Sequence, residues 1–311
     1  MDNSLLSVVL QRCTRYERST ICELVDETVK GLGCRYHFGG TVVLLKPNLI
    51  SGGGVDFSCT HKEFIGGVAM WFLDQGAKVR IGDSPAIGSG ASVCKKRGIT
   101  GALAGMDVEQ VDFIDSERKT LAGGVSVNVS RAALECDFLI NLPKVKAHKQ
   151  MYVTLAVKNI FGIVKGINKA TLHMTHGGSH EQFSEIILDL LELLPPSLHF
   201  ADGIVAMHRS GPLDGIPLQL NCVGGAMCPV ALDTALLELL KLEKPQSPLW
   251  RAASKRKLKG SDFDRIHFPA LSPADFSDRN FEVPEFLHAI RFNPFGFLYG
   301  MVKRVFPSLH R

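Results

Sequence analysis

Charged side chains follow several short apolar runs in the sequence. Lys46 comes directly after one such run, Asp83 follows a second, Lys144 and His148 follow a third, and Asp202 ends a fourth. In open parallel sheets, ligands bind beyond the carboxyl ends of the strands, where loops converge and polar side chains replace apolar ones. If each run is a strand, these charged groups gather at one end of a sheet and form a binding site.

A lysine at the end of a buried strand needs a compensating negative charge or water, because burial of a bare ammonium group is unfavourable. Asp83 and Asp202 are candidate partners for Lys46 and Lys144, so structural ion pairs are one explanation of the pattern. A functional site is the other explanation. We favour it because several lysines, including Lys146, converge with histidines.

A second lysine-bearing segment covers residues 154–162 and continues to Lys165. If this segment is helical, Lys158 and Lys165 lie two turns apart on one face and reach the same anion. A lysine face in contact with solvent is the alternative.

Three histidines follow within a short distance, at positions 173, 176 and 180. Imidazoles at such intervals can converge on a metal, and a glycine-containing loop before a helix can bind an anion. Proton transfer and a capped turn are the alternatives. His173, His176 and His180 are therefore candidate ligands of a divalent metal.

The candidate site combines these groups. The expected catalytic residues are His148, Lys144 and Asp83. The expected ligand-binding residues are Lys46, Asn48, Ser84, Lys146, Lys158, Asn159, Lys165 and Asp202.

The elements that position these residues follow an α/β pattern. Short apolar runs alternate with amphipathic ones, which predicts a mainly parallel or mixed sheet with helices on both faces. Strands are expected at residues 7–11, 41–46, 78–82, 108–113, 137–142, 199–205 and 218–223. Helices are expected at residues 19–31, with a serine cap, and at residues 61–75 and 181–194.

The composition is that of an ordinary globular protein, with 45% hydrophobic and 21% charged residues in 311. The excess of 35 basic over 31 acidic residues is too small to indicate nucleic-acid binding. The cysteines lack the spacing of iron–sulfur ligands, so we expect no such cluster. Neither a signal peptide nor a membrane-spanning run is recognisable, which predicts a cytoplasmic location.

The chain changes character near its end. We expect residues 1–244 to form the α/β domain and residues 245–311 to form a basic, Phe-rich helical appendage. Within it, residues 295–306 place apolar side chains on one helical face, so peripheral membrane contact is an alternative to docking on the domain. Docking is favoured because exposed apolar stripes are rare on monomers.

Several motifs recur in a characteristic order along residues 40–240. They are Lys46-Pro47-Asn48, Gly82-Asp83-Ser84-Pro85, Pro143-Lys144-Val145-Lys146-Ala147-His148, Lys158-Asn159, Asp202-Gly203 and Gly211-Pro212. In this order they resemble the family catalogued as domain of unknown function 362. The resemblance implies an intracellular protein whose biochemical activity is not established for the family as a whole.

Many members of that family carry an additional ferredoxin-like module with two four-iron clusters, which implies a role in redox metabolism. This sequence lacks the module, so any electrons would come from a separate electron-transfer protein. His208 also departs from the family pattern, which implies an acidic residue at that position.

The favoured function is an enzyme that binds a small phosphate- or carboxylate-bearing substrate or cofactor, while His148 or the histidines of residues 173–180 move a proton. The alternatives are a metal or cofactor carrier that uses those histidines and a peripheral scaffold anchored by the basic tail. Neither a P-loop nor a nucleophile elbow is present. The sequence therefore leaves the reaction class open.

Overall fold

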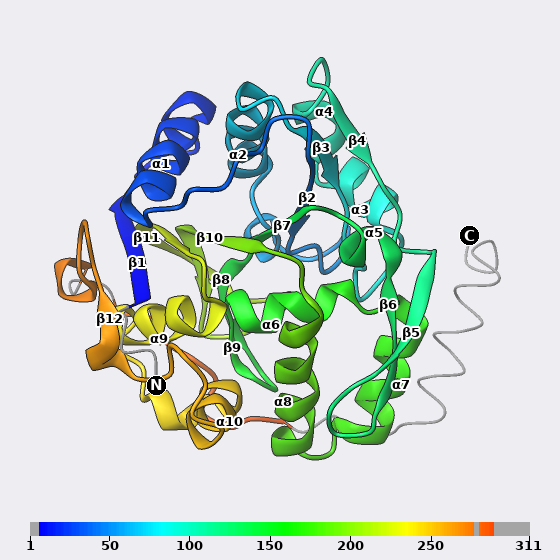
Figure 1. Cartoon of the computed structure of the whole chain (residues 1–311). Helices are drawn as coiled ribbons and strands as arrows, with labels where there is room; N and C mark the ends of the chain where they lie inside the picture. Colours follow the sequence, from blue (N-terminus) through cyan, green and yellow to red (C-terminus); the bar gives the residue numbers. More distant parts are fainter. Residues whose placement is uncertain (1–5, 277–279, 289–311) are drawn as a thin grey trace.

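The structure is a computed structural model that describes residues 6–276 and 280–288, apart from the side chains of residues 167, 170, 173 and 174. Within these ranges the chain forms a ten-stranded mixed sheet with helices on both faces (Figure 1). The α/β fold class predicted from the sequence is therefore confirmed.

Adjacent parallel strands form the centre and one side of the sheet. In spatial order they are β10 (Ser197–His208), β7 (Phe138–Leu142), β2 (Val42–Pro47), β3 (Lys78–Ile81) and β4 (Val108–Gln110). In the register of β2 and β7, Lys46 pairs with Asn141. Polar residues of neighbouring strands therefore meet at the carboxyl edge of the sheet.

The other side of the sheet contains the antiparallel pairs. β11 (Ile216–Ala226) pairs antiparallel with β10 and with β1 (Leu6–Arg12), and β12 (Ile266–His267) pairs parallel with β1. β8 (Lys144–His148) pairs parallel with β10 and antiparallel with β9 (Tyr152–Thr154). Because β8 follows β7 directly, it carries its lysines and its histidine beyond the carboxyl end of the parallel strands.

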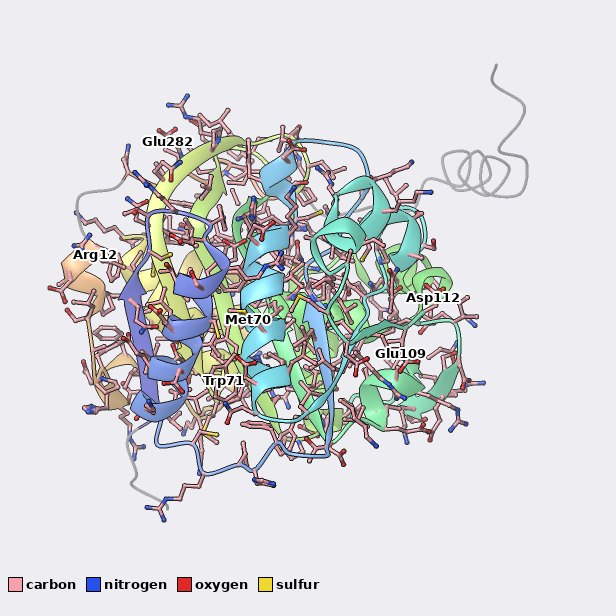
Figure 2. The ribbon with its side chains drawn as sticks, turned by 90° about the horizontal axis from the view of Figure 1, so that it is seen from above. Arg12, Met70, Trp71, Glu109, Asp112 and Glu282 are labelled. Atoms are coloured by element: carbon pink, nitrogen blue, oxygen red, sulfur yellow. The ribbon has the colours of Figure 1, made fainter. Side chains whose placement is uncertain are left out.

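Helices cover both faces of the sheet. One face carries α1 (Arg18–Gly31), α2 (Lys62–Asp74), α3 (Gly90–Lys96) and α4 (Ile99–Ala102). Figure 2 shows α1 and α2 side by side across this face. The opposite face carries α6 (Ala156–Ile160), α8 (His180–Asp189), α9 (Pro229–Leu239) and α10 (Pro248–Lys255).

Alternation along β2 shows how the strands serve both layers. Val43 and Leu45 belong to the apolar cluster beneath α1 and α2, whereas Leu44 belongs to the cluster that includes Phe183 of α8. Successive side chains of a strand point to opposite faces, so a strand covered on both faces is apolar along its whole length. This is why the buried strands read as continuous apolar runs.

The remaining elements of the described chain are a two-stranded sheet, two further α-helices and several 3-10 helices. They are β5 (Ser116–Thr120) and β6 (Ser126–Ser130), which form an antiparallel pair, α5 (Arg131–Leu134), α7 (Gly166–His176), and the 3-10 helices η1 (Asp56–Ser58), η2 (Phe161–Ile163), η3 (Leu190–Leu193), η4 (Lys244–Gln246), η5 (Phe263–Arg265) and η6 (Pro273–Phe276).

The predicted elements are present, with differences at their ends. The strand expected at residues 108–113 ends at Gln110, and the strand expected at residues 199–205 extends over residues 197–208. The helix expected at residues 181–194 ends at Asp189 and continues as η3. The serine cap predicted for the first helix is wrong: Glu17 occupies the N-cap position of α1 and makes no side-chain capping bond.

The division into residues 1–244 and 245–311 stays a prediction. In the described part beyond residue 244, α10 packs against α8 and α9, and β12 joins the sheet beside β1. The helix expected at residues 295–306 lies outside the described residues. Among the helices that are described, none is long and apolar enough to cross a membrane.

Candidate functional site

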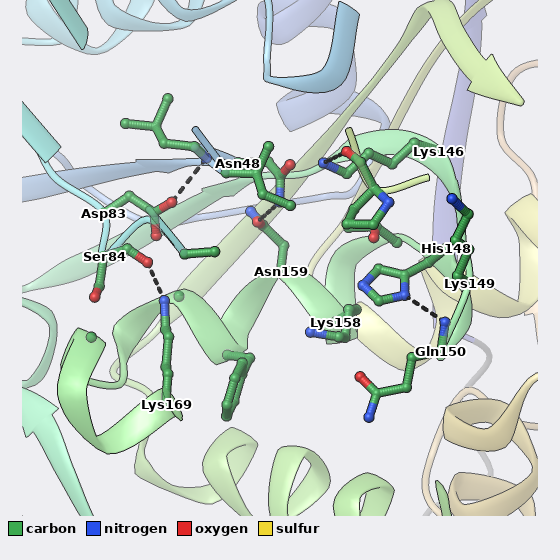
Figure 3. A pocket seen from close by; sticks show the side chains of 18 of the residues that line it. Asn48, Asp83, Ser84, Lys146, His148, Lys149, Gln150, Lys158, Asn159 and Lys169 are labelled. Carbon is green, nitrogen blue, oxygen red and sulfur yellow. Dashed lines mark hydrogen bonds between the residues drawn. The ribbon is translucent and has the colours of Figure 1, made fainter. Parts of the chain in front are cut away.

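A cavity of about 470 Å³ lies beyond the carboxyl ends of β2 and β3, beside β8, α6 and α7 (Figure 3). Its polar lining consists of Asn48, Asp83, Ser84, Lys146, His148, Lys149, Gln150, Thr154, Lys158, Asn159, Lys169 and His288. Figure 3 shows Lys146, Lys158 and Lys169 approaching the cavity from different sides. Since these residues come from different elements, the fold assembles the cavity from segments that are distant in the sequence.

Most of the ligand-binding residues expected from the sequence line this cavity or support it. Those that line it are Asn48, Ser84, Lys146, Lys158 and Asn159, together with two of the expected catalytic residues, Asp83 and His148. Lys46 lies behind the lining and contacts Asp83. The structure thus brings these residues together, while their individual roles stay predictions.

Lys46 and Asp83 form a buried ion pair at the edge of the cavity. The distance from Lys46 Nζ to Asp83 Oδ1 is 2.9 Å, and the two side chains are 0% and 4% exposed. Asp83 Oδ2 accepts a hydrogen bond from the backbone N–H of Leu49 at 2.9 Å. Burial lowers the pKa of Lys46, and Asp83 opposes that shift.

Further lysines of the cavity have no carboxylate partner. Lys46 is paired with Asp83, whereas no ion pair within the described residues joins Lys146, Lys158 or Lys169 to a carboxylate. Lys146 Nζ donates to the carbonyl oxygen of Ser58 at 2.6 Å, and Lys169 Nζ donates to the carbonyl oxygen of Ser84. Positive charge therefore exceeds negative charge around the cavity.

Burial changes the proton affinity of these lysines. It lowers the pKa of Lys146 to about 8 and that of Lys169 to about 7. Burial also lowers the pKa of Lys158 to about 7, and the neighbouring charges of Lys169, Lys146 and Lys46 act in the same direction. Desolvation and like charges both disfavour an ammonium ion. An anion in the cavity would relieve both effects.

A row of asparagine side chains runs from the cavity into the sheet. Asn141 Nδ2 donates to the carbonyl oxygen of Ala156 at 3.0 Å, so Asn141 Oδ1 must be the atom that accepts from Asn159 Nδ2, at 2.8 Å. Asn159 Oδ1 then accepts from Asn48 Nδ2 at 2.7 Å. A carbonyl oxygen can only accept, so it fixes the orientation of every amide in the row. Asn48 Oδ1 is left as a buried acceptor without a partner.

The ring of His148 is fixed by the turn that follows β8. His148 Nδ1 accepts hydrogen bonds from the backbone N–H groups of Gln150 and Met151, at 3.0 and 3.2 Å. In the neutral ring the proton must therefore lie on Nε2. This tautomer can donate a hydrogen bond from Nε2, but it has no lone pair there to take up a proton. This tautomer suits hydrogen-bond donation from Nε2, and the proton transfer expected of His148 stays a prediction.

Most of the chain matches a known protein family. The family described as "Domain of unknown function (DUF362)" matches residues 43–238, which include the cavity segments from Asn48 to Lys169. The chain belongs to this family. A curated relative, "Thylakoid-associated protein sll1697" of Synechocystis sp., is 32% identical over 290 residues, covering 92% of this chain and 90% of that protein.

Solved structures show more distant similarity to this DUF362 member. A protein from Thermotoga maritima is 14% identical, with a TM-score of 0.43, over 67% of this chain and 55% of that chain. The lactate racemase apoprotein from Thermoanaerobacterium thermosaccharolyticum is 12% identical, with a TM-score of 0.47, over 76% of this chain and 58% of that chain. The chain therefore spans little more than half the length of either structure.

Lys144 and Asp202 form a second buried ion pair of the DUF362 chain, and they do not line the cavity. Lys144 Nζ donates to Asp202 Oδ2 and to the Tyr16 hydroxyl oxygen, both at 2.8 Å. Tyr16 in turn donates to Asp202 Oδ1 at 2.7 Å, and the His61 ring stacks on Tyr16. The expected pairing of Lys144 with Asp202 is thus present, but these bonds engage the ammonium group that was assigned a catalytic role.

Lys165 does not share a helical face with Lys158, so that prediction is wrong. The segment is helical only through η2, and Val164 then adopts an extended conformation with φ −76° and ψ 135° before α7 begins. Lys169, on α7, lines the cavity instead. No sequence pattern indicates this, because the break in the helix at Val164 decides which lysine turns toward the cavity.

The histidines at positions 173 and 176 belong to α7, and His180 begins α8. They do not form the single loop expected from the sequence. Among the residues whose side chains are described, no three His, Cys, Asp or Glu side chains form a group that could hold a metal ion. The side chain of His173 is not among those described, so this finding does not test it. Metal binding by His173, His176 and His180 therefore stays a prediction. His180 Nε2 is buried without a hydrogen-bond partner.

Proposed function

We propose that this DUF362 chain is an enzyme that binds a small phosphate- or carboxylate-bearing substrate in the cavity between β8, α6 and α7. The observation that carries the proposal is the excess of positive charge there: Lys146, Lys158 and Lys169 surround the cavity without a carboxylate partner within the described residues. A buried cation without a counter-ion is unfavourable. A bound anion would supply the missing charge.

The mixture of polar groups in the cavity lining supports an enzyme over a protein that only binds an anion. Its lining combines ammonium donors with the imidazole of His148 and the unpartnered amide oxygens of Asn48 and Gln150. An anion alone uses only donors, whereas the amide oxygens need a donor from the ligand. A substrate with both kinds of group fits this lining. Lysines with pKa values near 7 add groups that exchange protons at physiological pH.

Anion binding is tested by calorimetric titration of inorganic phosphate and of acetate into the full-length protein. We expect Lys146→Met or Lys169→Met to weaken binding about 10- to 100-fold, since a hydrogen bond to a charged group contributes about 1.5–3 kcal/mol. Lys165→Met is the matched control, because Lys165 lies in the same segment but outside the cavity lining. Absence of binding for both anions, or equal binding by Lys146→Met and Lys165→Met, would contradict the proposal.

Three further predictions from the sequence do not depend on the cavity, and we retain them as separate proposals. They are a cytoplasmic location, a separate electron-transfer partner and a divalent metal at the three histidines. The Synechocystis relative is named for association with thylakoids, so membrane attachment is the competing location. Cell fractionation of the tagged protein distinguishes the two.

A further inference from the structure

Within the described residues, Lys158 differs from the other lysines of the cavity in that its amine has no hydrogen-bond acceptor, although Lys169 Nζ also lies 5.7 Å from the centroid of the Phe161 ring. Lys158 Nζ lies 4.8 Å from the ring centroid of Phe161 and 5.7 Å from that of Phe183. No described residue accepts a hydrogen bond from it. Lys46, Lys146 and Lys169 each donate to a carbonyl oxygen of the protein, and Lys149 donates to Asp214 Oδ2. Lys158 is therefore set against aromatic rings at the wall of the cavity, with its amine left for a ligand.

We propose that the Lys158 amine forms an imine with the carbonyl carbon of the substrate, and that the substrate is accordingly an aldehyde or ketone that also bears a carboxylate or phosphate. The inference rests on the proposed anion site, because it assigns the anionic group to the other lysines. It names the substrate class and one catalytic residue of that site.

The protonation state of the amine fits this role. An amine attacks a carbonyl only when it is neutral, and desolvated lysines near other cations are activated in this way. Burial and the charges of Lys169, Lys146 and Lys46 lower the pKa of Lys158 to about 7. Roughly half of the Lys158 amines are then neutral at pH 7, against about one in three thousand for a lysine with an ordinary pKa.

The division of labour among the lysines follows from their contacts. Lys146 and Lys169 are held in place by backbone carbonyl oxygens, so they supply fixed positive charge for the carboxylate or phosphate. Lys158 has no such anchor and can form a covalent bond without breaking a hydrogen bond of the protein. Lys169 has a similarly lowered pKa, but its amine is directed to the carbonyl oxygen of Ser84.

The chemical step balances without an additional reactant. The nitrogen lone pair of Lys158 forms a C–N bond as the C=O π bond breaks, and the amine proton passes to the oxygen to give a carbinolamine. The hydroxyl group then leaves as water together with the remaining N–H proton, which breaks the C–O bond and gives a neutral imine that is in protonation equilibrium with solvent. The buried acceptors Asn48 Oδ1 and Gln150 Oε1 line the same cavity and suit the hydroxyl group of the carbinolamine. No oxidation or reduction takes place.

Reductive trapping tests this assignment. The full-length protein is incubated with pyruvate or with dihydroxyacetone phosphate in the presence of sodium cyanoborohydride, and the mass of the protein and of its peptides is measured. We expect one stoichiometric adduct on the peptide that contains Lys158, formed faster as the pH rises through 7. The two probes distinguish a carboxylate-bearing from a phosphate-bearing substrate. Acetone, which lacks an anionic group, should label the protein at least tenfold more slowly.

Variants identify the amine. Lys158→Ala and Lys158→Arg should abolish the adduct, whereas Lys165→Ala, outside the cavity lining, should retain it. An adduct that persists in Lys158→Ala, or that maps to another lysine, would overturn the assignment. Equilibrium dialysis of the same probes against the same samples separates the two proposals. Binding of both probes without any adduct contradicts the imine alone, and absence of binding by a folded protein contradicts the anion site as well.

Discussion

At the scale of single residues, the two buried ion pairs have different surroundings. Lys144 and Asp202 are enclosed by Tyr16 and His61, and the hydrogen bonds of the ammonium group stay within that cluster. Lys46 and Asp83 lie against the cavity, where Asp83 belongs to the lining. Buried pairs gain little net stability over apolar residues, but removal of one partner leaves an uncompensated charge. A change to the Lys46–Asp83 pair should therefore alter both the stability of the protein and the binding of a ligand in the cavity.

This gives a prediction for Asp83→Asn. We expect it to lower the free energy of unfolding by about 3–5 kcal/mol, because the Lys46 ammonium group loses its counter-charge. Asp214→Asn is the control: Asp214 pairs with Lys149 at 2.9 Å, but both side chains are well exposed, and such pairs contribute about 1 kcal/mol or less. Urea unfolding measures both variants. Equal losses for the two would show that burial of the Lys46–Asp83 pair has no energetic consequence.

At the scale of elements, the close approach of η2 to the strand ends shapes the cavity. A Cβ atom added at Gly162 would collide with Lys46 Nζ and Asp83 Oδ1. The backbone N–H of Ser84 donates to the carbonyl oxygen of Gly162 at 3.2 Å, which holds the loop after β3 against η2. The absence of a side chain at this position lets η2 pack directly on the ion pair.

We therefore expect Gly162→Ala to destabilise the protein by about 1–3 kcal/mol, as overpacking of a filled interior does, and to weaken phosphate binding. Gly101→Ala is the matched control, because Gly101 lies in α4 and a Cβ atom there meets nothing within 4 Å. That substitution should be neutral or slightly stabilising. Thermal unfolding with and without phosphate measures both effects. A Gly162→Ala variant as stable as Gly101→Ala would refute the packing argument.

The sequence predicted the strand ends well for a physical reason. Apolar runs covered on both faces end abruptly, so the sequence alone places Lys46, Asn48 and Asp83 at the carboxyl edge of the sheet. The sequence-based prediction was wrong where the direction of a side chain depends on irregular backbone. The extended residue Val164 turns Lys169 rather than Lys165 toward the cavity. Tyr16, which binds both Lys144 and Asp202, lies too far along the chain for any spacing rule to connect them.

At the scale of the whole molecule, the cavity lysines couple folding to pH. A lysine whose pKa is lowered by folding is protonated more often in the unfolded chain. Stability then rises with pH between the folded and the unfolded pKa. For Lys169 this window runs from about 7 to its usual value of 10.5. Asp233 acts in the opposite direction below about pH 8, because burial raises its pKa to about 8. Comparison of the parent chain with a variant that lacks the Lys169 amine isolates the contribution of this lysine to the pH dependence of stability.

We expect the free energy of unfolding of the parent chain to rise more between pH 7 and pH 9 than that of Lys169→Met, by about 2 kcal/mol. The parent chain gains stability as the unfavourable charge is lost, and the variant has no such charge to lose. Urea unfolding at several pH values measures the difference. Saturating phosphate should diminish it, since the anion favours the charged lysine. Parallel pH profiles for the two proteins would show that Lys169 keeps an ordinary pKa.

The asparagine row has a consequence for how a ligand lies in the cavity. Each amide from Asn141 to Asn48 is held in one orientation by the next, so Asn48 cannot turn its NH2 group to the ligand without breaking the bond to Asn159. The Asn48 end of the cavity therefore repels a carboxylate or phosphate oxygen and accepts only a hydrogen-bond donor, while the lysines attract the anion. A ligand with an anionic group at one end and a hydrogen-bond donor at the other therefore has one preferred orientation in the cavity. A molecule with anionic groups at both ends would be excluded even though the net charge of the lining favours it.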